Sequence, residues 1–122
     1  MLSPEQIQEV RNKVWLADQA LVQRDHQVFC KRIWDATAHA IKCVARERAW
    51  PCGTFDDIWK AGRRLAEESD NEYGWTSALG CAELLRTNGR GLVQERYEIE
   101  EDWDISTSFI DRMLGFSVRD VK

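Results

Sequence analysis

Polar side chains with the chemistry to bind or cleave a phosphate ester recur along the segment 32–46. They are Arg32, Asp35, His39, Lys42 and Arg46, separated in turn by three, four, three and four positions. Side chains three or four positions apart are neighbours on an α-helix, so a helical segment places all five on one face. We call these five residues the polar stripe.

Arg32 and His39 are the candidate catalytic pair of the polar stripe. Histidine exchanges a proton near neutral pH, and a neighbouring arginine can hold a phosphate and stabilise developing negative charge. With His39 as general acid or base and Arg32 as phosphate holder, the pair would cleave RNA without a metal, the 2′-hydroxyl attacking the adjacent phosphorus. Two stripes that meet across the two-fold axis of a dimer would form a composite cleft for this reaction.

The polar stripe has a plainer interpretation as the solvent face of its helix. Asp35 lies three residues after Arg32 and four before His39. We expect it to bridge to both, each contact contributing about 0.2–0.5 kcal/mol.

A third interpretation is a pocket for a small molecule or a nucleotide between the long helices. Trp34 and Trp59 would line it together with the polar side chains of Asp35, Lys42 and Arg46. Such a pocket would make the protein a ligand-binding module and not an enzyme.

The elements that must position these residues are all helical, since apolar residues recur at helical spacing and no convincing strand is present. Ser3 and Pro4 have the types expected at the start of a first helix, which breaks near 23–25. Asp25 is the expected N-cap of a second helix over about 26–49. That helix carries two adjacent apolar stripes, which is typical of a helix in the middle of a bundle. The first stripe is Phe29, Ile33, Ala36, Ala40 and Val44, and the second is Cys30, Trp34, Ala38, Ile41 and Ala45.

The second half of the chain is expected to add three shorter helices. Thr54 is the expected N-cap of one that ends in the acidic segment 67–72, and another spans 76–86. Residues 90–104 are predicted as an extended or loosely helical connection, and a last helix covers 105–114. We therefore expect one all-α domain over residues 1–122, a bundle of four to five helices of which two are long and antiparallel.

Composition and charge describe an ordinary soluble domain. The 122 residues have a formal net charge of −4, unevenly spread: residues 1–66 hold 11 Lys/Arg against 8 Asp/Glu, and residues 67–122 hold 6 against 13. A basic first half and an acidic second half favour self-association, whereas generic binding of RNA or nucleotides needs a more basic surface. The sequence has no apolar run of membrane-spanning length and no signal peptide, so we expect a cytoplasmic protein that does not bind membranes.

The four cysteines are expected to be reduced and structural. Cys30, Cys43, Cys52 and Cys81 form no C-x-x-C pair, and the chain has two histidines, so neither a zinc site nor another cofactor is predicted. Cysteines of this kind serve as small apolar core residues, with Cys52 exposed in a turn.

Six tryptophans are several times the usual number for a chain of this length. They are expected to serve core and helix packing, and alternatively to anchor a dimer interface. A base-stacking platform is a further option, but acidic neighbours disfavour it around Trp75 and Trp103.

Residues 32–59, RIWDATAHAIKCVARERAWPCGTFDDIW, resemble the HEPN superfamily, in particular its branch related to the archaeal PaREP proteins. The match covers residues 5–66 best and depends on a W-x-A-x-A-H-A-x-K helix followed by an R-x-W-P turn. The residues that carry it are Trp34, Ala36, Ala38, His39, Ala40, Lys42, Arg48, Trp50 and Pro51.

The resemblance implies an all-α bundle that forms dimers and that either cleaves RNA, binds nucleotides or has no catalytic activity. Nucleases of the superfamily carry an arginine and a histidine separated by four to six residues, with a polar residue after the arginine. Arg32 and His39 have six residues between them, but Ile33 is apolar. We therefore favour a non-catalytic homodimeric interaction or ligand-binding module, with a second protein as a further partner, over a metal-independent ribonuclease or a small-molecule pocket protein.

Overall fold

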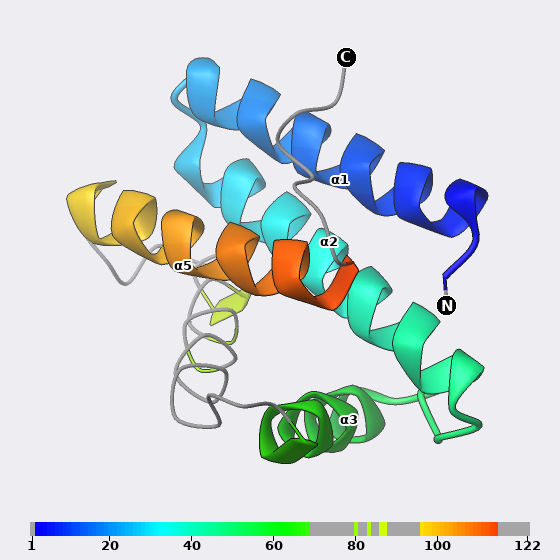
Figure 1. Cartoon of the computed structure of the whole chain (residues 1–122). Helices are drawn as coiled ribbons and strands as arrows, with labels where there is room; N and C mark the ends of the chain where they lie inside the picture. Colours follow the sequence, from blue (N-terminus) through cyan, green and yellow to red (C-terminus); the bar gives the residue numbers. More distant parts are fainter. Residues whose placement is uncertain (1, 69–79, 81–82, 84–85, 88–95, 115–122) are drawn as a thin grey trace.

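The computed structural model describes residues 2–68, 80, 83, 86–87 and 96–114, and they contain the helices α1 (Pro4–Val22), α2 (His26–Glu47), α3 (Phe55–Glu68) and α5 (Arg96–Leu114) (Figure 1). No strand occurs among these residues, which confirms the all-α class. Gly80, Glu83, Arg86 and Thr87 are also helical, and the rest of the helix expected over 76–86 lies outside the described residues. Among the helices described, every one is either too short or too polar to cross a lipid bilayer.

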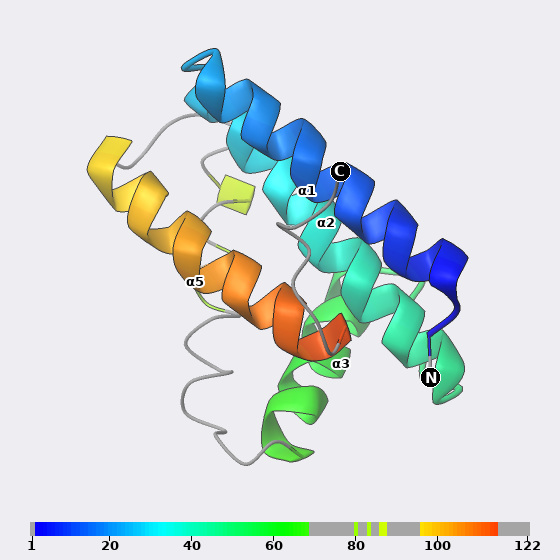
Figure 2. The ribbon, with the colours of Figure 1, turned by 45° about the horizontal axis from the view of Figure 1, so that its top comes forward.

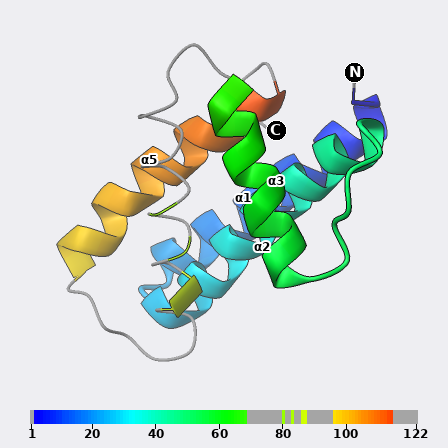
Figure 3. The same ribbon diagram turned by 90° about the horizontal axis from the view of Figure 1, so that it is seen from below.

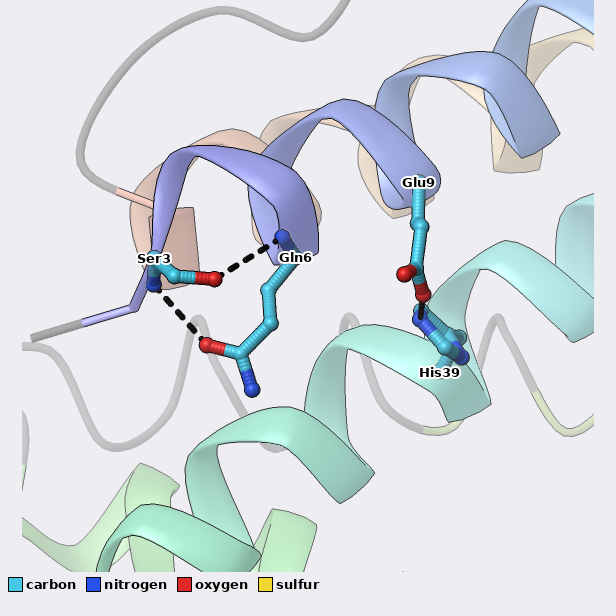
Figure 4. Close-up of polar contacts among 4 residues, drawn as sticks. All are labelled: Ser3, Gln6, Glu9 and His39. Atoms are coloured by element: carbon cyan, nitrogen blue, oxygen red, sulfur yellow. Dashed lines mark hydrogen bonds and ion pairs between the residues drawn. The ribbon is translucent and has the colours of Figure 1, made fainter.

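The predicted N-caps form as expected. The Ser3 hydroxyl accepts a hydrogen bond from the backbone N–H of Gln6 at 3.1 Å, and the Gln6 side chain accepts one from the Ser3 N–H at 2.8 Å (Figure 4). Asp25 accepts from the Val28 N–H at 3.2 Å, and Thr54 from the N–H of residue 57 at 3.1 Å. Each cap satisfies a backbone donor that the first turn of a helix leaves unpaired.

The helices α1 and α2 end with the same pattern of backbone hydrogen bonds. The N–H of Asp25 bonds to the carbonyl of Ala20, and the N–H of Trp50 bonds to that of Ala45. These are the six-to-one bonds of Schellman motifs. The residue before each donor has a positive φ, 60° at Arg24 and 58° at Ala49, although glycine is usual at this position. α2 thus ends at Glu47, two residues earlier than predicted, because the chain already turns at Arg48 and Ala49.

The turn at Arg24 sends α2 back alongside α1, as Figures 1 and 2 show. The first apolar stripe of α2 packs between α1 and the end of α5, and the residues of this first core cluster are Val10, Val14, Ala17, Ala20, Phe29, Cys30, Ile33, Ala36, Ala40, Ile110 and Leu114.

α3 packs against the second apolar stripe, near the C-terminal end of α2. Figure 3 shows α3 crossing α2 after the connection that follows residue 47. The buried residues of this second core cluster are Ala38, Ile41, Ala45, Ile58 and Ala61. α2 therefore has neighbours on two flanks, one for each of its apolar stripes.

The last helix is longer than predicted. α5 begins at Arg96, so the residues 96–104 that we expected to be extended or loosely helical are regular helix. The sequence alternates as a strand does over residues 93–99, but no strand occurs among the described residues to pair with it, and the helix satisfies the backbone groups of residues 96–99 locally.

Candidate functional site

Arg32 and His39 both lie on the flank of α2 beside α1, and each bonds to it. Arg32 Nη1 donates to the backbone carbonyl of Leu16 at 3.0 Å. His39 Nε2 lies 2.9 Å from Oε2 of Glu9, and the exposed fraction is 21% for the His39 side chain and 59% for that of Glu9 (Figure 4). Both members of the candidate catalytic pair therefore join α1 and α2.

The seven-residue spacing of Arg32 and His39 keeps the guanidinium group and the imidazole ring apart. Seven residues of helix rise about 10 Å, and the contacts of Arg32 and His39 on α1 are also seven residues apart, at Leu16 and Glu9. The two groups follow the seam between the helices at separate points. This arrangement does not aim both groups at a single phosphorus atom, as the cleavage chemistry requires.

The bridges expected of Asp35 do not form. Asp35 is exposed and makes no hydrogen bond or ion pair with Arg32 or His39. Its place is taken by Glu9, which lies thirty residues away in sequence. Of the remaining stripe residues, Lys42 is half-buried and Arg46 is exposed.

Electrostatics at the seam act on a buried thiol. Cys43 is 1% exposed, and its burial raises the pKa of the thiol. The negative charge of Glu9 raises that pKa further, whereas the positive charge of Arg46 lowers it. Desolvation is the largest of these effects, so Cys43 is a neutral core thiol and not a nucleophile.

Trp34 and Trp59 belong to a different place, an aromatic group at the α2–α3 contact. The ring centroids of Trp34 and Phe55 are 5.7 Å apart, and those of Phe55 and Trp59 are 6.5 Å apart. The guanidinium carbon of Arg86 lies 4.0 Å from the Phe55 centroid and 6.0 Å from that of Trp34. These separations are those of ordinary aromatic and cation–π packing.

A shallow hollow of about 180 Å³ adjoins this group, lined by Phe55, Asp56, Trp59 and Glu83. None of the polar stripe residues lines it. The structure thus brings Arg32 and His39 to the α1 flank of α2, and Trp34 and Trp59 to its α3 flank. The single pocket that was to combine them is not formed among the described residues. Nor is any group of three or more His, Cys, Asp or Glu side chains placed there to hold a metal ion.

The contacts of Arg32 and His39 with α1 were not predicted, although the sequence contains a signal for them. In a hairpin of two helices that turns at Arg24, residues equidistant from the turn face each other. Arg32 and Leu16 are each eight residues from Arg24, and His39 and Glu9 are each fifteen residues from it. The predicted break at 23–25 could therefore have pointed to both contacts, although neither was predicted from it.

Exposed apolar residues on α1 are a second feature of the structure that the sequence did not predict. Exposed fractions are 51% for Trp15, 45% for Leu16 and 76% for Val22. Trp34, Trp50 and Trp59 are half-buried, and the side chains of Trp75 and Trp103 lie outside the described residues. Trp15 is thus the most exposed tryptophan side chain that the structure describes.

No family model, no curated protein and no solved structure matches this chain.

Proposed function

We propose that the chain is a HEPN-like antiparallel helical bundle that works as a homodimeric interaction module. The observation that carries the proposal is the apolar surface on α1. Three of the five exposed large apolar side chains in the described part of the chain lie on this one helix, at Trp15, Leu16 and Val22. Trp15 and Val22 are two turns apart and so share a face. Contiguous exposed apolar surface with a tryptophan anchor is typical of protein interfaces.

Charge favours a second copy of the same chain as the partner. Exposed Lys31 and Arg46, with half-buried Lys42 between them, give α2 a cationic edge. The sequence of α5 holds six Asp or Glu against two Arg, and Glu101 and Asp104 on it are exposed. One chain therefore carries both a cationic surface, on α2, and an acidic surface, on α5. In a two-fold dimer, α2 of each copy would face α5 of the other, so the charge contact would form twice.

A metal-independent ribonuclease is not favoured. Arg32 and His39 are engaged with α1 at points that the helix rise separates by about 10 Å. A fixed tie between two helices explains both residues without a substrate.

Sedimentation equilibrium of the full chain tests the proposed dimer. We expect the wild type to be a dimer at micromolar concentration, and Trp15→Gln with Val22→Gln to raise the dissociation constant at least tenfold while helical content is unchanged. Ile105→Gln is the matched control, because Ile105 on α5 is 40% exposed but lies on another helix. A monomeric wild type, or equal weakening by the control, would contradict the α1 interface.

The charge argument has its own test. Raising the salt concentration from 50 mM to 500 mM should weaken the dimer several-fold, because salt screens exposed charges. Lys42→Glu with Arg46→Glu should weaken it at low salt and remove most of this salt dependence. A salt-independent dimer would refute the contribution of charge and leave the apolar contact as its basis.

A further inference from the structure

A second hollow lies where the chain turns from α2 into α3, away from both the polar stripe and the exposed face of α1. Its volume is about 200 Å³, and Figure 3 shows the connection and the helix that form it. One wall is the turn after α2, and the other is a ridge of α3. The lining residues are Trp50, Pro51, Asp57, Lys60, Ala61 and Arg64. We call it the Trp50 hollow.

Arg64 lies over the indole of Trp50. Its guanidinium carbon lies 4.3 Å from the ring centroid, which is close for a cation–π contact. Within the described part of the chain, Arg64 makes no hydrogen bond or ion pair, and it is exposed. The contact with Trp50 therefore holds in place a guanidinium whose N–H donors stay available for bidentate binding of a carboxylate.

The neighbouring cations already have acidic partners. Arg48 also contacts the Trp50 ring, at 5.1 Å, but it forms an ion pair with Glu68. Lys60 Nζ lies 2.9 Å from Oδ2 of Asp56, a contact that raises the pKa of Lys60. Arg64 is thus the lining cation for which we find no acidic partner in the described ranges.

The remaining lining groups restrict what an occupant can be. Trp50, Pro51 and Ala61 offer apolar surface, so the body of the ligand is apolar and fits a ring. Asp57 adds a negative charge to the same wall. An anion with more than one negative charge would meet Asp57 as well as Arg64, so a single negative charge is favoured.

The volume of the Trp50 hollow limits the size of its ligand. A cavity of about 150 Å³ is enough for benzene, so the Trp50 hollow holds one six-membered ring with a short acidic group and is too small for a whole nucleotide. We propose that the Trp50 hollow binds a small carboxylate carrying a single aromatic ring. The carboxylate pairs with Arg64, and the ring lies against Trp50, Pro51 and Ala61.

Isothermal titration with benzoate tests the proposal on the full chain. We expect a measurable dissociation constant below about 10 mM, in the range of ligands of this size. Benzamide, which has the same shape without the charge, should bind at least tenfold more weakly, and phenyl phosphate should also bind more weakly because its second charge faces Asp57. Benzoate that does not bind at 10 mM, or benzamide that binds equally well, would overturn the proposal.

Neighbouring arginines supply the matched variants. Arg64→Gln should weaken benzoate binding at least tenfold, whereas Arg63→Gln should leave it unchanged, because Arg63 is exposed on the same helix but does not line the hollow. Trp50→Leu should also weaken binding by removing the stacking surface. Equal effects of the two arginine variants would place the anion elsewhere, and the thermal unfolding midpoint of each variant verifies that it is folded.

Discussion

Replacing Ala49 with glycine should stabilise the protein. Ala49 follows the end of α2 with a φ of 58°, in the left-handed region where an L side chain places its Cβ close to backbone atoms. The N–H groups of Ala49 and Trp50 bond to the carbonyls of Arg46 and Ala45, so the conformation is held by the motif itself. Glycine keeps these bonds and removes the Cβ.

The expected gain can be worked out from two opposing effects. Left-handed backbone costs an L residue about 1–2 kcal/mol, and glycine removes that cost. Glycine also gains freedom in the unfolded chain, which opposes folding by about 0.5–1 kcal/mol. The free energy of unfolding should therefore rise by about 0.5–1 kcal/mol, and the unfolding midpoint by about 2–5 °C for a domain of this size.

Urea unfolding followed by circular dichroism measures the change. A control comes from Lys31, which is exposed inside α2, where glycine in place of alanine should cost about 1 kcal/mol. Arg24 provides a repeat, because it ends α1 with a φ of 60°, and Arg24→Gly should be more stable than Arg24→Ala. If Ala49→Gly destabilises the protein as Lys31→Gly does relative to Lys31→Ala, the left-handed turn is not the native conformation.

Four further expectations concern the core, the seam and the cysteines. Truncating Phe29, which is fully buried, to alanine should cost about 3–5 kcal/mol in chemical unfolding. A double-mutant cycle on Glu9 and His39 should give a coupling of about 0.2–1 kcal/mol that falls with salt, and a value near zero would remove the tie. Burial raises the pKa of Cys43 above its ordinary value of 9.0, so the folded chain keeps its proton where the unfolded chain loses it. Stability should therefore fall as pH rises from 9.0 through the folded pKa, and Cys43→Ala should remove this loss. Half-exposed Cys52 should react with a thiol reagent at pH 8 before the buried Cys30 and Cys43 do.

Local features of the fold were predictable because their causes are local. Ser3, Asp25 and Thr54 were identified as N-caps from residue type alone, since each hydroxyl or carboxylate meets an N–H three residues later. The two apolar stripes of α2 were equally visible, because helical spacing fixes which residues share a flank. What fills each flank depends on other helices, so the sequence could not assign α1 and α5 to one and α3 to the other.

The errors arose where distant residues decide the outcome. Asp35 was the obvious partner for His39 within one helical turn, yet Glu9 lies closer in space because α2 returns along α1. The start of α5 was misplaced because residues 93–99 alternate as a strand does, and periodicity over so few residues does not distinguish the two. The Trp50 hollow depends on the direction in which the chain leaves the turn at Ala49. A glycine at this position would have predicted the left-handed turn, but an alanine did not.

The helices share core clusters of different size, and this difference affects how the protein partially unfolds. Among the described residues, α1 and the end of α5 share a core cluster of eleven buried residues with α2, whereas the cluster between α2 and α3 has five, three of them alanines. Partial opening should therefore begin at α3 and leave the α1–α2 hairpin closed, at a free energy below that of complete unfolding. A carboxylate bound in the Trp50 hollow would contact both α3 and the connection that precedes it, and so its binding would protect α3 against proteases and amide exchange.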